Sequence, residues 1–176
     1  MSSKILSIAM MGKNRIGLIS DLTKYIYTNG ANIHKSRMVG YSGSFIISLK
    51  ANVPVHFNFN NLQHTFQNEL EIFNTNNITE LDNLYKSTKK DTYNAKISVS
   101  LADTPGIIHN TAYVLANNNI NINELRSDID TGAFTNTPIF KLDIDASIPN
   151  KINIHELYTK IYDNTELQGV ISISYI

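Results

Sequence analysis

The chain repeats itself after 89 residues, and this repeat limits the possible folds more than any other feature of the sequence. In one register without gaps, Gly17 aligns with Gly106 and Arg37 aligns with Arg126. A repeat of this length indicates a small folding unit that is present twice, and 176 residues are enough for two small domains. Further identical pairs in the same register include Ile8 with Ile97, Ile19 with Ile108, Asn29 with Asn118, Asn32 with Asn121, and Ile33 with Ile122.

Each half shows the same succession of strand and helix patterns. A short apolar run predicts a first strand, and a tight loop leads from it into a helix. The helix of the first half carries apolar side chains at helical spacing, at Ile19, Leu22 and Ile26. The predicted elements are a first strand (5–11 and 96–101), a second strand (32–39 and 121–130), a third strand (44–49 and 138–146), a second helix (58–71 and 154–162) and a fourth strand (78–84 and 170–175).

The order βαββαβ is that of a ferredoxin-like unit, in which two helices cover one face of an antiparallel-rich sheet. We therefore expect an α+β protein with two such domains in tandem, at residues 1–85 and 95–176, joined by a polar linker at 86–94. In this topology strands one and three are central, and strands two and four are edges. Strands one and three of the first half are apolar on both faces, which predicts that their outer face is covered.

The composition excludes several classes of protein. The chain has no cysteine, so disulfides and thiolate metal sites are impossible. No apolar stretch approaches the roughly 20 residues of a membrane span, and the start of the chain lacks the long apolar run of a signal peptide. We therefore expect a cytoplasmic protein that makes no contact with a membrane.

The net charge of zero conceals a division between the halves. Residues 1–90 carry ten Lys or Arg and five Asp or Glu, and residues 91–176 carry the reverse. Opposite fields favour docking of the halves, within one chain or between two. Because a lone unit of about 80 residues is marginally stable, we expect a homodimer that covers an edge strand and a sheet face. Neither half has the basic stripe that a nucleic-acid-binding protein needs.

No pattern typical of a catalytic or metal site is present. The sequence has no nucleophile elbow and no phosphate-cradling glycine loop. His56 and His64 are eight residues apart, not the three or four that place two metal ligands on one helix face. Tyr25 and Tyr27 are interpreted as aromatic residues that pack the first helix. We expect no enzymatic activity, no metal and no cofactor.

A basic residue recurs at one position of the second strand, Arg37 in the first half and Arg126 in the second. Two interpretations stay open. The pair forms a contact across a domain interface or with an anion, or each arginine protects an exposed edge strand against aggregation.

Two segments resemble the opening βαβ of an ACT domain: residues 12–38, and the sequence DTPG at 103–106 followed by Asn121 and Ile122. Within that superfamily the chain resembles the tandem-ACT glycine cleavage system transcriptional repressor group over about residues 4–176. This closer resemblance rests on the short motifs SRM at 36–38, TPIF at 137–140, IP at 148–149 and INIHEL at 152–157.

The resemblance implies an amino-acid site between two domains, formed by the loop after strand one of one domain and the start of strand two of its neighbour. The first loop departs from the family pattern, because Asn14 and Ile16 stand where the family favours an acid and a proline. The residues implied are Asn14, Arg15, Ile16, Gly17 and Leu18 with Asn32 and Ile33 in the first copy, and Asp103, Thr104, Pro105, Gly106 and Ile107 with Asn121 and Ile122 in the second.

The chemistry of these residues suits such a ligand independently. The free N–H groups at a helix N-terminus attract a carboxylate, a glycine lets the backbone approach a ligand, and an asparagine amide can bind either an ammonium or a carboxylate. A structural interpretation stays open. Gly17 and Gly106 would then permit close packing of helix on sheet, and Asn32 and Asn121 would hold the turn after the helix.

The resemblance implies a regulatory protein that senses an amino acid, glycine in the repressor group. Because no helix-turn-helix is recognisable, any effect on transcription would pass through a protein partner such as a transcription factor. The alternative is a detached ACT regulatory subunit of an amino-acid or one-carbon enzyme. RNA binding is a third possibility, since RNA-recognition modules share the topology, but they stack bases on aromatic side chains of strands one and three, and the first strand here has none.

Overall fold

A computed structural model describes residues 3–41, 43–67, 91–131, 137–165 and 169–176. None of the described helices is long and apolar enough to span a membrane. The first half contains β1 (Ser3–Lys13), α1 (Leu18–Thr28), β2 (Asn32–Tyr41), β3 (Ser44–Pro54) and α2 (Phe59–Thr65). The second half contains β4 (Thr92–Ala102), α3 (Ile107–Asn117), β5 (Asn121–Thr131), β6 (Pro138–Pro149), α4 (Ile154–Thr165) and β7 (Val170–Tyr175).

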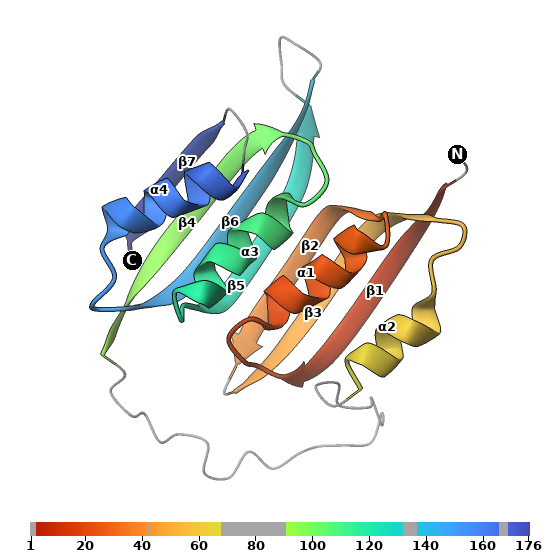
Figure 1. The fold of residues 1–176 in the computed structure, drawn as a ribbon, viewed down its shortest axis with the longest axis horizontal. Coiled ribbons are helices and arrows are strands. Elements are labelled where there is room, and N and C mark those ends of the chain that lie inside the picture. The colour runs from red at the N-terminus through yellow and green to blue at the C-terminus, as the bar shows by residue number, and fades with distance from the viewer. Residues whose placement is uncertain (1–2, 42, 68–90, 132–136, 166–168) are drawn as a thin grey trace.

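All the described strands join in one antiparallel sheet in the order β1-β3-β2-β5-β6-β4-β7, and the helices lie on one of its faces (Figure 1). We call the other side the open face. The second half has the order of a ferredoxin-like unit, with its first and third strands, β4 and β6, at the centre. The described strands of the first half follow the same order. The predicted α+β fold with two ferredoxin-like units is confirmed.

The two halves are joined by antiparallel pairing of β2 with β5, which we call the seam. Arg37 pairs with Arg126, its own equivalent in the repeat, and Met38 pairs with Leu125. Because equivalent residues meet across antiparallel strands, the halves are related by a pseudo-twofold axis that passes through the seam. Strands β2 and β5 are edges of their own units, but they lie inside the complete sheet.

Several elements differ in length from the prediction. Strand β4 begins at Thr92 rather than at residue 96, because Thr92 pairs with Pro149; residues 92–94 of the predicted linker are therefore strand. Helix α2 is shorter than predicted within the described residues. The predicted fourth strand of the first half (78–84) and residues 86–90 of the linker lie outside the described residues.

Apolar side chains fill the space between the sheet and the helices. Phe45 and Phe140, in the third strands of the two halves, are each 2% exposed, and they belong to one core that continues across the seam through Met38 and Leu125. Helices α1 and α3 pack against each other above this core. The seam is therefore sealed on its helix side by buried side chains, which makes the two halves one packed body.

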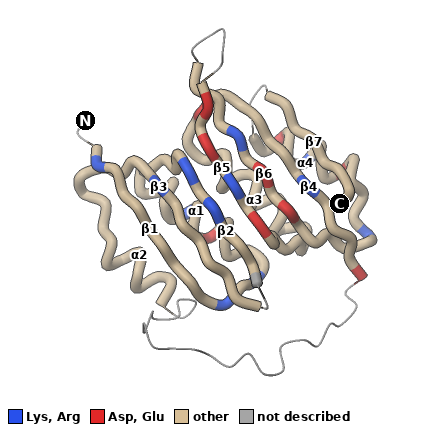
Figure 2. Tube along the Cα trace, turned by 180° about the vertical axis from the view of Figure 1, so that it is seen from behind, with Lys and Arg blue, Asp and Glu red and all other residues tan. Residues whose placement is uncertain are grey.

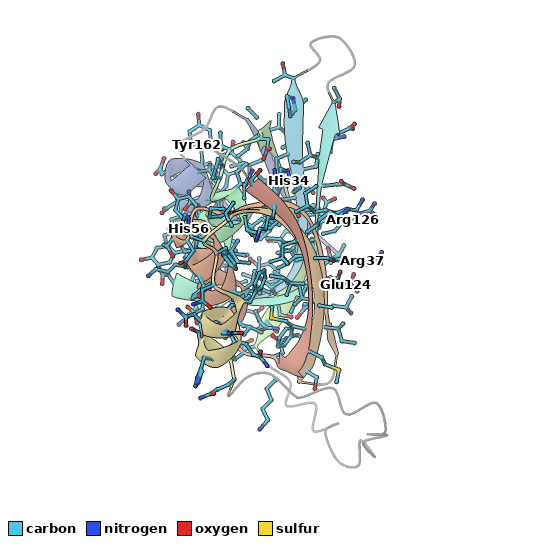
Figure 3. The ribbon with its side chains drawn as sticks, turned by 90° about the vertical axis from the view of Figure 1, so that its right-hand side faces the viewer. His34, Arg37, His56, Glu124, Arg126 and Tyr162 are labelled. Carbon is cyan, nitrogen blue, oxygen red and sulfur yellow. The ribbon has the colours of Figure 1, made fainter. Side chains whose placement is uncertain are left out.

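The open face of the first half carries apolar side chains without a cover. Ile5 in β1 is 72% exposed and Ile46 in β3 is 56% exposed. In the described part of the chain, no helix lies against this face (Figure 3). The predicted cover for this face is therefore not supplied by the described elements, and the homodimer that would supply it stays a prediction.

A pair of buried serines crosses the seam on its helix side. The hydroxyl oxygens of Ser36 and Ser127 are 2.7 Å apart, and both residues are buried. We expect Ser127→Ala alone to lower the free energy of unfolding by about 1–3 kcal/mol, because it leaves the Ser36 hydroxyl without its partner. The double change Ser36→Ala with Ser127→Ala should cost less than the two single changes together. Urea denaturation of the four proteins checks this, and strictly additive losses would contradict it.

Candidate functional site at the ends of the seam

A cavity lies between the halves at each end of the seam. The first, which we call the Gly106 cavity, is lined by Thr23, Ile26, Tyr27, Ala31, Asn32 and Ile33 from the first half and by Thr104, Gly106, Ile107, Ile108, His109 and Phe140 from the second. Its pseudo-twofold counterpart, the Gly17 cavity, is lined by Asn14, Arg15, Gly17, Leu18, Ile19 and Ser20 from the first half and by Ala112, Ala116, Ile120 and Ile122 from the second.

Both cavities are small in this conformation. The Gly106 cavity has a volume of about 20 Å³, and the Gly17 cavity has about 10 Å³, which is room for about one water each. Each combines the loop after the first strand of one half with the start of the second strand of the other half. The family resemblance implied this combination of segments for a ligand site.

The two glycines shape the start of the helices above the cavities. Gly17 has φ 84° and Gly106 has φ 97°, a left-handed conformation that side chains with a Cβ rarely adopt. Neither helix has a side-chain cap, so the N–H groups of the first turn have no intrahelical acceptor. Ile107 and Ile108 of that turn line the Gly106 cavity, which gives the cavity the partial positive charge of a helix N-terminus.

An aromatic side chain covers one cavity and is missing from the other. A Cβ placed on Gly106 would lie 3.2 Å from Cε2 of Tyr27, so the tyrosine ring sits directly over this glycine. The ring also stacks on His109, with the ring centroids 6.1 Å apart. In the repeat Tyr27 corresponds to Ala116. A Cβ placed on Gly17 would lie 3.8 Å from the Cβ of Ala116. The cavities are therefore chemically different despite their common backbone.

Unpartnered polar atoms belong to Thr104, which lines the Gly106 cavity, and to two residues that are close in sequence to its lining residues. Among the described residues, three side chains have a buried nitrogen or oxygen without a hydrogen-bond partner: Oδ1 of Asp103, Oγ1 of Thr104 and Nε2 of His34. Two belong to the loop that precedes α3, and the third follows Asn32 closely on β2. A buried polar atom without a partner costs about 1–3 kcal/mol. A ligand that hydrogen-bonds to these atoms would recover that free energy.

Charge also distinguishes the two cavities. Arg15 lies at the Gly17 cavity, and its Nη1 forms an ion pair with Oδ2 of Asp21 at 2.8 Å. The equivalent of Arg15 is Thr104, and no Lys, Arg, Asp or Glu is found among the described residues that line the Gly106 cavity. The Gly106 cavity therefore presents neutral donors and acceptors.

Ion pairs also lie on the open face, away from both cavities, and two of them have N–O distances below 3 Å. Nζ of Lys35 donates to Oδ2 of Asp128 at 2.7 Å, and this hydrogen bond is the largest of the effects that lower the pKa of Asp128. The hydrogen bond from Lys141 likewise lowers the pKa of Asp130. Both carboxyl groups are therefore charged at neutral pH, and Lys35 is held by Asp128 across the seam.

Ten of the fourteen predicted site residues line one of the two cavities, five at each. Those that line a cavity are Asn32, Ile33, Thr104, Gly106 and Ile107 at the first, and Asn14, Arg15, Gly17, Leu18 and Ile122 at the second. Asp103 is next to the first cavity without lining it. Ile16 and Pro105 are exposed, and the amide of Asn121 donates to Oδ1 of Asn123 at 3.0 Å. Whether these residues bind a ligand stays a prediction.

Seven residues that line the Gly106 cavity were not predicted from the sequence, and three of them are aromatic: Tyr27, His109 and Phe140. Tyr25 packs on Phe57 and Phe66 as predicted, but Tyr27 covers the cavity. The repeat contained a signal for this difference, because the aligned position in the second half is the small residue Ala116. No three His, Asp or Glu side chains in the described part of the chain are placed to hold a metal ion.

The sequence matches no protein-family model and no curated protein. Among solved structures, the aspartate kinase from Synechocystis is similar over 97% of this chain and 28% of that one, with a TM-score of 0.58 and 16% identity. An unknown protein from Galdieria sulphuraria (TM-score 0.45, 17% identity) and a "putative glycine cleavage system transcriptional repressor" (TM-score 0.38, 15% identity) each align over 99% of both chains. At 16% identity the similarity to the aspartate kinase establishes the fold alone, which is that of two tandem ferredoxin-like units.

Proposed function

We propose that this protein is a non-catalytic regulator that senses a small amino acid, glycine by its resemblance to the repressor group, in the Gly106 cavity. The observation that carries the proposal is the set of unpartnered buried atoms on Thr104, which lines a cavity between the halves, and on Asp103 and His34, which are close in sequence to other lining residues. The alternative, that the glycines and asparagines only hold turns, does not account for these atoms.

The proposed binding mode uses groups already in place. The ligand carboxylate would accept hydrogen bonds from the first turn of α3, where the N–H groups have no intrahelical acceptor. The hydroxyl of Thr104 is a further donor, and the ammonium group would donate to the amide oxygen of Asn32 or to Oδ1 of Asp103. Because a cavity of about 20 Å³ is too small for an amino acid, Tyr27 would have to turn outward, and this residue is 44% exposed.

A ligand in this cavity would touch both halves and so favour one arrangement of α1 against α3. We propose that a protein partner reads this change, either a transcription factor or, as the alternative function, an amino-acid or one-carbon enzyme. Co-purification from cells distinguishes the two kinds of partner. The exposed apolar side chains of the outermost described strand β1, Ile5 among them, would contribute the surface for a homodimer, and the cytoplasm is the proposed compartment.

A thermal-shift screen of the amino acids tests the proposed function. A ligand at about one hundred times its Kd stabilises the folded state by about 2.7 kcal/mol, which for a chain of this size raises Tm by about 5–10 °C. We expect such a shift for glycine or another small amino acid and none for glycolate, which lacks the ammonium group. The absence of a shift for every amino acid at about 10 mM would contradict the proposal.

A further inference from the structure

The open face carries two arginines side by side at the centre of the molecule. Arg37 of β2 and Arg126 of β5 are register partners in the seam, and both point away from the helices (Figure 3). Side chains that are directly opposite on paired strands have Cβ atoms about 4.5–5.5 Å apart, and like charges in such a pair destabilise a sheet. Neither arginine protects a free edge, because β2 and β5 pair with each other. The edge-protection interpretation therefore does not apply within this chain.

Two acidic residues nearby, Asp128 and Asp143, already have other partners. Asp128 accepts from Lys35 at 2.7 Å, and Oδ1 of Asp143 accepts from the Ser98 hydroxyl at 2.6 Å and lies 3.8 Å from Nζ of Lys96. In the described part of the chain, no carboxylate lies within 4 Å of Arg37, Arg126 or Lys50. Two arginines of the seam and Lys50 of the adjacent strand β3 therefore have no ion-pair partner among the described residues.

These charges surround a depression in the open face with a volume of about 280 Å³. It is lined by the exposed residues Ser7, Lys35, Arg37, Ser48, Lys50 and Arg126 and by the buried residues Ser36, Leu49 and Ser127. Basic residues follow this part of the sheet, and acidic residues follow β5 and β6 beside it (Figure 2). The volume is close to the lower limit of small-molecule sites. Four cationic groups and two hydroxyls are all hydrogen-bond donors, which suits a ligand made of acceptors.

We propose that this depression, the seam cleft, binds a small molecule that carries a diphosphate group. Three unpaired cations match the charge of about −3 on a diphosphate, and guanidinium groups bind phosphate oxygens in pairs of hydrogen bonds. No aromatic side chain lines the cleft, so the recognition rests on the phosphates and not on a stacked base. The seam cleft is separate from the Gly106 cavity, on the opposite face of the sheet.

Calorimetry with inorganic pyrophosphate and with ADP tests the proposal at about 50 mM salt. We expect pyrophosphate to bind with a micromolar Kd that weakens at about 200 mM salt, and orthophosphate to bind at least about tenfold more weakly. The two probes distinguish the kinds of molecule that could carry the diphosphate. If ADP binds as tightly as pyrophosphate, the site accepts nucleotides. If pyrophosphate binds and ADP does not, the site excludes a nucleoside attached to the diphosphate. Citrate binding more tightly than pyrophosphate would overturn the assignment to phosphates, as would no binding of pyrophosphate at about 5 mM.

Substitutions on the exposed face locate the site without changing the fold. Arg37→Gln and Arg126→Gln should each weaken pyrophosphate binding by about tenfold or more, and the double variant should melt no lower than the wild type because a repulsive pair is removed. Asp128→Asn should strengthen binding severalfold, since it releases Lys35. Lys141→Gln, on the same face but paired with Asp130, is the matched control and should change nothing. Unchanged binding in the folded double variant would overturn the proposal, whatever the amino-acid screen finds.

Discussion

Gly106→Val is expected to abolish amino-acid binding, with a loss of about a hundredfold or more in affinity. The backbone at Gly106 has φ 97°, and an added Cβ would lie 3.2 Å from the Tyr27 ring. A branched side chain there would fill the cavity of about 20 Å³ and prevent the backbone from approaching a ligand. The same change should also lower the free energy of unfolding by about 1–3 kcal/mol, because valine is strained at positive φ. Calorimetry on the folded variant, checked by its thermal melt, measures the loss.

Gly17→Val is the matched control for this experiment. Gly17 also precedes a helix with positive φ, at 84°, but the nearest atoms to an added Cβ are Nη1 of Arg15 at 3.7 Å and Cβ of Ala116 at 3.8 Å. The control should lose a similar amount of stability and keep its affinity. Wild-type affinity in a folded Gly106→Val protein would remove the Gly106 cavity from the site. If only Gly17→Val lost binding, the ligand would belong in the counterpart cavity.

Leu125→Asp is expected to cost at least about 4 kcal/mol of the free energy of unfolding and to disrupt both halves together. Leu125 is 2% exposed on the helix side of the seam, opposite Met38, which is 1% exposed. The change removes a buried apolar side chain, which alone costs about 2–5 kcal/mol, and puts a carboxylate where no cation is available. Since folded proteins are stable by only about 5–15 kcal/mol, we expect a protein that is largely unfolded at 37 °C.

The neighbouring change Glu124→Gln serves as the control, because Glu124 is exposed on the open face and should alter stability by no more than about 0.5 kcal/mol. Urea denaturation followed by circular dichroism gives both values. Two separate transitions in Leu125→Asp, with one half still folded, would contradict the view that the seam makes the halves a single packed body.

The sequence predicted the elements well where their periodicity was regular. Strand β7 has the predicted limits, and the apolar stripe at Ile19, Leu22 and Ile26 is buried. Strand ends were predicted less well. Thr92 was assigned to a linker because it is polar, but it pairs with Pro149. Such pairing depends on the partner strand and leaves no trace in local periodicity.

The pairing of the two halves could not be decided from the sequence. An edge strand such as β2 can pair within its chain or with a second chain, and both choices satisfy the same backbone groups. For the candidate site, the resemblance implied segments that line the two cavities in the structure, but the contacts of individual residues within them differ. Asn121 was expected to match Asn32, yet the amide of Asn121 is hydrogen-bonded to Asn123. The residue that aligns with Asn123 in the first half is His34. The difference between His34 and Asn123 at this aligned position therefore gives Asn32 and Asn121 different hydrogen-bonding surroundings.

The seam joins segments that are far apart in the chain, since Ser36 to Val39 pair with Glu124 to Ser127. Contacts of such long sequence separation form late and slow the folding of a chain. During synthesis β2 is complete long before β5 has been made, so for that interval it presents unpaired N–H and C=O groups to other chains. The β5 strand of a second molecule offers the same register and the same apolar partners. An exchange of halves between two chains would therefore use the native seam contacts and produce a domain-swapped dimer without any new interface.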